Sequence, residues 1–121
     1  MKLLLDNCVD IHAKTLFGGH TVEHVLDRGW DALGNGRLLA ATAAVGFDAL
    51  VTVDKNLRYQ QNLEQLPLTV IELDVFKNRI DQLSEIARFI PRALEQADRF
   101  RFVSVKTDGT TECLGDRRSG G

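Results

Sequence analysis

Two aspartates each follow a short apolar run, and their carboxylates are the groups in this sequence best suited to chemistry. Asp6 follows Leu3–Leu5, and Asp54 follows Leu50–Val53. Such runs are typical of strands buried in a parallel sheet, and open α/β sheets bind ligands beyond the carboxyl ends of their strands. If the two strands are neighbours, both carboxylates face one crevice. A hard divalent cation, Mg²⁺ or Mn²⁺, would neutralise their repulsion there and could activate water toward a phosphodiester.

Each of these residues, and each polar residue near them, also has a purely structural interpretation. An aspartate just before a helix is a common N-cap, which is the simpler role for Asp54. Asn7 and Asn35 are of a type common in turns. Lys55 and Arg58 follow Asp54 in a predicted helix, where cations usually cover a solvated face. The residue types alone therefore leave both interpretations open.

The elements that must position these residues alternate between strands and helices. Short runs of apolar or alternating residues predict five strands, at Lys2–Leu5, His20–Leu26, Asp48–Val53, Pro67–Leu73 and Arg101–Val105. We predict helices between them, at Asp10–Phe17, Arg37–Val45, Lys55–Leu63 and Asn78–Ala97, with a kink at Pro91. This order predicts an α/β fold with a mostly parallel central sheet covered by helices on both faces.

The C-terminal segment differs in composition from the rest. Residues 1–106 are predicted to form one domain, and residues 107–121 a hairpin or a flexible tail. Asp108-Gly109 favours a turn into a last strand, Thr110–Leu114, and we expect disorder beyond Leu114.

Composition indicates one globular domain and excludes several classes of protein. The chain has 121 residues, 44% of them hydrophobic, and 15 Lys and Arg against 17 Asp and Glu give a net charge of −2. No apolar run approaches the roughly 20 residues of a membrane span. The apolar start is too short for a signal peptide, so we expect a cytoplasmic protein without membrane contact. The charge balance excludes coating of nucleic acid by bulk charge, but not local contact with RNA.

The two cysteines do not indicate a zinc site. Cys8 and Cys113 are far apart in sequence and lack the paired spacing of zinc ligands. We predict that both are free thiols and that Cys8 serves as a small hydrophobic residue.

Several stretches together resemble a known family. The segments KLLLDNCV, GFDALVTVDKNLRYQQNL and LPLTVIEL are similar to the PIN-like family DUF5615, which is related to the Mut7-C and VapC-type PIN domains. The resemblance covers Met1–Leu94, and TVDKNLRYQQNL is its most specific part. It implies a PIN-like three-layer α/β/α sandwich and metal-dependent cleavage of RNA, in many relatives by the toxin of a toxin–antitoxin pair.

The resemblance assigns roles only where residues match. Asp6 and Asp54 match the two strand-end aspartates and would hold the metal. Asn7 and Asn35 stand where relatives often have acids, and their amide oxygens would complete the metal shell or orient water. Lys55 and Arg58 would bind the RNA backbone, with the arginine forming a bidentate contact.

The lack of further matched acids leaves two hypotheses. The first is a Mg²⁺- or Mn²⁺-dependent PIN-like ribonuclease, the toxin of a pair neutralised by an antitoxin protein. The second is a catalytically weak or inactive PIN-like protein that serves as an interaction module. Asp10, Asp31 and Asp48 are candidate substitutes for the absent acids, although Asp48 begins its strand at the end opposite Asp54. The apolar surface of Asn78–Ala97 also suggests a homodimer.

Other α/β classes fit less well. We find no acidic pair, Thr and Lys set of a receiver domain, no DxDx[TV] of a haloacid-type phosphatase and no GxGxxG for a dinucleotide.

Overall fold

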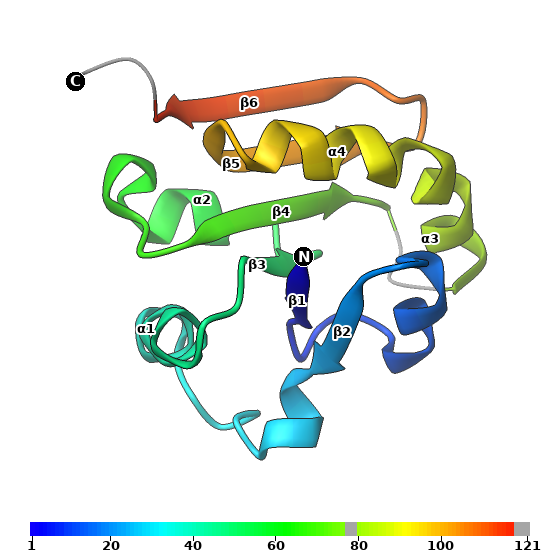
Figure 1. Cartoon of the computed structure of the whole chain (residues 1–121). Coiled ribbons are helices and arrows are strands. Elements are labelled where there is room, and N and C mark those ends of the chain that lie inside the picture. The colour runs from blue at the N-terminus through cyan, green and yellow to red at the C-terminus, as the bar shows by residue number, and fades with distance from the viewer. Residues whose placement is uncertain (77–79, 118–121) are drawn as a thin grey trace.

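The computed structural model describes residues 1–76 and 80–117 of the chain, and within them one sheet has helices on both faces (Figure 1). The strand order is β2-β1-β3-β4-β5-β6, and every neighbouring pair is parallel except β5 and β6. The strands are β1 (Lys2–Leu5), β2 (Thr21–His24), β3 (Ala49–Thr52), β4 (Thr69–Asp74), β5 (Phe100–Lys106) and β6 (Thr111–Asp116). The predicted α/β class with a mostly parallel sheet is confirmed.

Most helices are shorter than the sequence pattern predicts, whereas α1 (Asn35–Val45) begins two residues before the predicted Arg37. The other α-helices are α2 (Leu57–Gln60), α3 (Ile80–Ile86) and α4 (Ile90–Ala97). The 3₁₀ turns are η1 (Ile11–Leu16), η2 (Val25–Arg28), η3 (Leu63–Gln65) and η4 (Ala87–Phe89). None of the described helices is both long enough and apolar enough to cross a membrane.

The sheet divides the core into two layers because neighbouring side chains of a strand point to opposite faces. Leu3 and Leu5 of β1 pack in the layer beneath η1, α3 and α4, together with Ile86 and Ala93. Leu4 packs in the other layer, beneath α1 and α2. All three leucines are fully buried, which explains why the strand is apolar throughout rather than alternating.

Three predicted elements differ most from the observed ones in extent. The strand predicted to Leu26 ends at His24, because the His24 ring accepts the N–H of Leu26 and starts η2. The helix predicted at Lys55–Leu63 is reduced to Leu57–Gln60. The long helix is divided into α3, η4 and α4, with Pro91 in the first turn of α4; its predicted start at Asn78 lies outside the described residues.

The C-terminal hairpin forms as predicted, but it is longer than expected. Gly109 turns the chain with a φ of 90°, and β6 pairs antiparallel with β5 as far as Asp116. Disorder beginning directly after Leu114 was therefore the wrong expectation, because Gly115 and Asp116 continue the strand. The rest of the predicted tail, residues 118–121, lies outside the described part of the chain.

The strand order creates a switch point between β1 and β3. From β1 the chain crosses to β2 on one side, and it then returns past β1 to place β3 on the other side. Crevices at such points lie beyond the carboxyl ends of the two central strands and are the usual ligand sites of open α/β sheets. Asp6 and Asp54 follow these two strands.

Candidate functional site

Thr52, the last residue of β3, connects the Asp6 carboxylate to the backbone of Asp54. The backbone N–H of Asp6 donates to the Val51 carbonyl at 2.8 Å, which extends the pairing of β1 and β3 beyond Leu5. The Thr52 hydroxyl donates to Asp6 Oδ2 at 2.8 Å and accepts the backbone N–H of Asp54 at 3.0 Å. The predicted adjacency of the two strand ends is therefore confirmed.

Asp6 is a buried carboxylate fixed by three donors. It is 7% exposed, and its Oδ1 accepts the N–H of Asn7 at 2.7 Å. Its Oδ2 accepts the Thr52 hydroxyl and, at 3.6 Å, the Cys8 thiol. A carboxylate offers about four lone-pair positions, so one remains. Hydrogen bonds of this kind orient carboxylates that ligate metals.

Cys8 contributes a protonated thiol to this arrangement. Burial raises the pKa of Cys8, and the negative charge of Asp6 raises it further. The sulfur also lies 3.4 Å from the Thr52 hydroxyl oxygen. Cys8 and Cys113 are both free cysteines, as predicted. Cys8 is half-buried and packs against the core layer of Leu3 and Leu5.

Asp54 is not the N-cap that its position suggested, because the N-cap of α2 is Asn56 and no side chain of the described residues caps this helix. Asp54 Oδ1 accepts the N–H of Asn56 at 2.9 Å, just before α2. Within the described part of the chain, its Oδ2 accepts no hydrogen bond. One carboxylate oxygen thus stabilises the turn, and the other is available to a ligand.

The two asparagines lie on different elements. Asn7 follows Asp6 in the turn after β1, and its side chain is exposed. Asn35 begins α1, and its Nδ2 donates to Gln60 Oε1 at 3.0 Å, which joins α1 to the end of α2. Among residues 1–76 and 80–117, no three His, Cys, Asp or Glu side chains gather closely enough to hold a metal.

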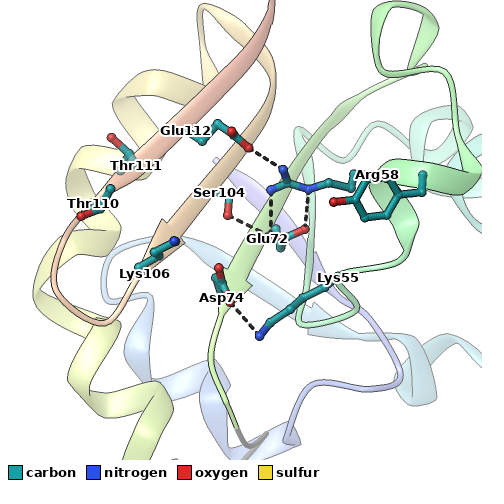
Figure 2. Close-up of a pocket in the computed structure, with 10 residues that line it drawn as sticks. Lys55, Arg58, Glu72, Asp74, Ser104, Lys106, Thr110, Thr111 and Glu112 are labelled. Atoms are coloured by element: carbon teal, nitrogen blue, oxygen red, sulfur yellow. Dashed lines mark hydrogen bonds and ion pairs between the residues drawn. The ribbon is translucent and has the colours of Figure 1, made fainter.

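Lys55 and Arg58 are not directed at the aspartate pair. Lys55 Nζ lies 2.8 Å from Asp74 Oδ1 at the end of β4, and Arg58 binds the carboxylates of Glu72 and Glu112 (Figure 2). Burial opposes the charge of Arg58, but its hydrogen bonds to these two carboxylates raise its pKa above the ordinary value. Both predicted phosphate-binding cations therefore already have carboxylate partners.

These two cations line a cavity of about 440 Å³ beyond the carboxyl ends of β4 and β5. Its lining includes three residues that the sequence analysis did not single out, Glu72, Ser104 and Lys106. Glu72 is 2% exposed and accepts the Ser104 hydroxyl at 2.9 Å. The only sequence signal was a polar residue at matching positions of two apolar strands, since Glu72 and Ser104 are register partners.

Comparison of the chain with family models, with curated proteins and with solved structures found no match. The candidate function therefore depends on the site geometry and on the sequence pattern.

Proposed function

We propose that the chain is a Mg²⁺- or Mn²⁺-dependent PIN-like ribonuclease whose metal ligands are Asp6 and Asp54. The observation that carries this proposal is the Thr52 hydroxyl, which donates to the Asp6 carboxylate and accepts the Asp54 backbone N–H at the switch point of the sheet. A buried aspartate with fixed geometry and a second with an available oxygen form an oxygen donor set suited to a hard cation.

A two-carboxylate site fits Mg²⁺ that binds together with its substrate. This ion keeps several waters and is commonly held by one or two carboxylates plus substrate phosphates. When bound, it would supply a Lewis acid and an activated water at the phosphodiester. Asp6 would provide the oriented ligand, Asp54 the second one, and the exposed Asn7 amide would orient water. Asn35 donates through Nδ2 to Gln60, so only its amide oxygen could serve the site.

The biological setting belongs to the same proposal. A ribonuclease of this kind would act on cytoplasmic RNA as the toxin of a pair, and a cognate antitoxin protein would restrain it. A homodimer remains part of this proposal.

RNA cleavage and cation binding test the proposal together. We expect the wild type to cleave single-stranded RNA with Mn²⁺ and to gain several degrees in melting temperature from millimolar Mn²⁺. Asp6→Asn and Asp54→Asn should abolish both effects. Asp48→Asn is the matched control, because Asp48 binds the Lys2 N–H at the opposite end of β3. Cleavage that survives both site variants would refute the proposal.

A second candidate function is a PIN-like interaction module without nuclease activity. The observation in its favour is that Lys55 and Arg58 are paired with carboxylates and no third acid joins Asp6 and Asp54 among the described residues. This candidate requires that Mn²⁺ leaves the melting temperature unchanged. It also requires that Asp6→Asn binds a protein partner as the wild type does.

A further inference from the structure

The cavity beside α2 is one strand removed from the proposed metal site. Lys55 follows Asp54 directly and lines the cavity, and β4 lies between β3 and β5. Neighbouring strands are about 4.8 Å apart, so the end of β5 lies roughly 10 Å from the end of β3. A chain that crosses the carboxyl edge of the sheet from Asp54 would therefore enter this cavity.

The cavity is lined by three carboxylates and three cations, and two of the cations are in ion pairs. Arg58 pairs with Glu72 and Glu112, and Lys55 pairs with Asp74 (Figure 2). Lys106, the last residue of β5, is exposed and forms no ion pair with any described residue. The lining has no net charge. Hydrogen bonds from Thr110 lower the pKa of Asp108, and the charge of Lys106 lowers it further. Lys106 is the cation that could meet an anionic group without breaking an ion pair among the described residues.

An exposed aromatic ring completes the cavity. Tyr59 lines it from α2 and is 80% exposed, an unusual exposure for a large ring. Rings of this kind stack on the bases of single-stranded nucleic acids, and any base can stack because each has a π-face.

A neighbouring hollow continues along the same edge. It shares Lys106 with the first cavity and contains Phe76, whose side chain is 87% exposed. Glu85 and Asp108 also line it and would repel a phosphate. A base rather than a phosphate therefore fits this hollow. Because the first cavity already accommodates one nucleotide, a base in the hollow implies a polymer longer than one nucleotide.

We infer that this cavity binds a nucleotide of single-stranded RNA next to the scissile phosphate, with Lys106 on a backbone phosphate and Tyr59 stacked on a base. The inference deepens the proposed function and rests on it for the identity of the substrate. It assigns to Tyr59 and Lys106 a binding role that is separate from the metal ligands.

Binding without metal tests the inference. The probe is a fluorescently labelled eight-nucleotide single-stranded RNA, titrated in EDTA and followed by anisotropy. We expect Tyr59→Ala to weaken binding at least about fivefold, whereas Tyr59→Phe, which keeps the ring, should bind as the wild type does. Lys106→Gln should weaken binding and reduce the salt slope by about 0.7, the value for one phosphate contact on a single strand. Lys2→Gln is the control, because Lys2 begins β1 and so lies at the amino ends of the strands, away from the carboxyl ends that form the cavity.

Three results would overturn the inference. The first is that Tyr59→Ala and Lys106→Gln both bind the single-stranded RNA with wild-type affinity. The others are that the wild type binds a duplex of the same sequence, or a mononucleotide, as tightly as the single strand. The proposed function fails independently. If RNA binding depends on Tyr59 but Mn²⁺-dependent cleavage is absent, the nuclease is refuted and the RNA site stands. If the protein cleaves RNA but the Tyr59→Ala and Lys106→Gln variants bind and cleave it as the wild type does, the RNA site is refuted and the nuclease stands.

Discussion

Thr52 is the residue on which the geometry of the aspartate pair depends. Its side chain is fully buried, and its hydroxyl both donates to Asp6 and accepts from the Asp54 N–H. Thr52→Val keeps the shape and removes the hydroxyl, which takes a donor from the buried Asp6 carboxylate and leaves the part-buried Asp54 N–H without its acceptor. We expect the free energy of unfolding to fall by about 1–3 kcal/mol in urea denaturation, and Mn²⁺ binding to weaken.

Thr42→Val is the matched control for this prediction. Thr42 is equally buried, but its hydroxyl only donates to the Leu38 carbonyl of its own helix. The expected loss of stability is below about 1 kcal/mol. Equal losses in the two variants would contradict the linking role of Thr52.

Cys8 predicts a dependence of stability on alkaline pH. The pKa of Cys8 is raised by burial and by Asp6, so the unfolded thiol, with its ordinary pKa of 9.0, loses its proton first as the pH rises. The stabilisation is therefore complete below pH 9.0 and declines above it. In a Cys113→Ser background, the free energy of unfolding should fall above that pH, and Cys8→Ala should flatten the profile. An unchanged profile would disprove a raised Cys8 pKa.

At the scale of elements, α2 is held to the sheet by Arg58. Its guanidinium is 20% exposed and binds Glu72, which is 2% exposed, and Glu112, which is 54% exposed. Arg58→Met leaves a buried carboxylate unpaired and should lower the free energy of unfolding by about 3 kcal/mol. Glu112→Gln removes the exposed pair and should cost less than about 1 kcal/mol. If the two variants lose the same free energy of unfolding in chemical denaturation, the burial of Glu72 does not determine how strongly its pair with Arg58 stabilises the fold.

The turn between β5 and β6 depends on a glycine. Gly109 has a φ of 90°, and a Cβ there would lie 2.6 Å from Phe89 Cε1 of η4. Gly19 has a similar φ of 82° but no atom within 4 Å of such a Cβ. Both alanine variants incur about 1–2 kcal/mol for the left-handed backbone, and Gly109→Ala should lose more through the contact. Thermal unfolding measures the difference in stability between the two variants. That difference should vanish if the Phe89 ring moves aside.

At the scale of the whole molecule, β6 forms one edge of the sheet and covers β5. It pairs with β5 from Thr111 to Asp116, although residues 1–106 had been predicted as the domain. A chain that ends at Lys106 exposes the edge of β5, and exposed edges pair with other chains. We expect its melting temperature to fall by more than about 10 °C and the protein to self-associate in size-exclusion chromatography.

Glu112→Gln in the full-length chain is the control for this truncation. It removes the ion pair with Arg58 but keeps the strand, so it separates the electrostatic loss from the loss of pairing. A truncated chain as stable as this variant would mean that β6 adds nothing to the sheet.

Local pattern in the sequence determined most of the elements. The strand at Lys2–Leu5 and the helix ending at Val45 were predictable because burial on both faces requires an apolar run and Gly46 accepts a left-handed cap. The adjacency of Asp6 and Asp54 followed as a conditional prediction, since carboxyl ends of neighbouring parallel strands share an edge. The length of helix α2 was overestimated, because side chains of the flanking turns compete with the helix: Asp54 Oδ1 accepts the Asn56 N–H before it, and Asn62 Oδ1 accepts the Glu64 N–H after it.

Only the tertiary structure decided the partners of the charged groups. Arg58 lies 54 residues from Glu112, and Lys55 pairs with Asp74 across the sheet edge, so no local spacing could show that these cations are neutralised. Lys106 and Tyr59 became candidates for the same reason, since their proximity depends on the order of β3, β4 and β5. The sequence by itself determined which residues stand at strand ends, because burial acts on each segment locally. The fold decided which strand ends are neighbours, because pairing is a long-range choice.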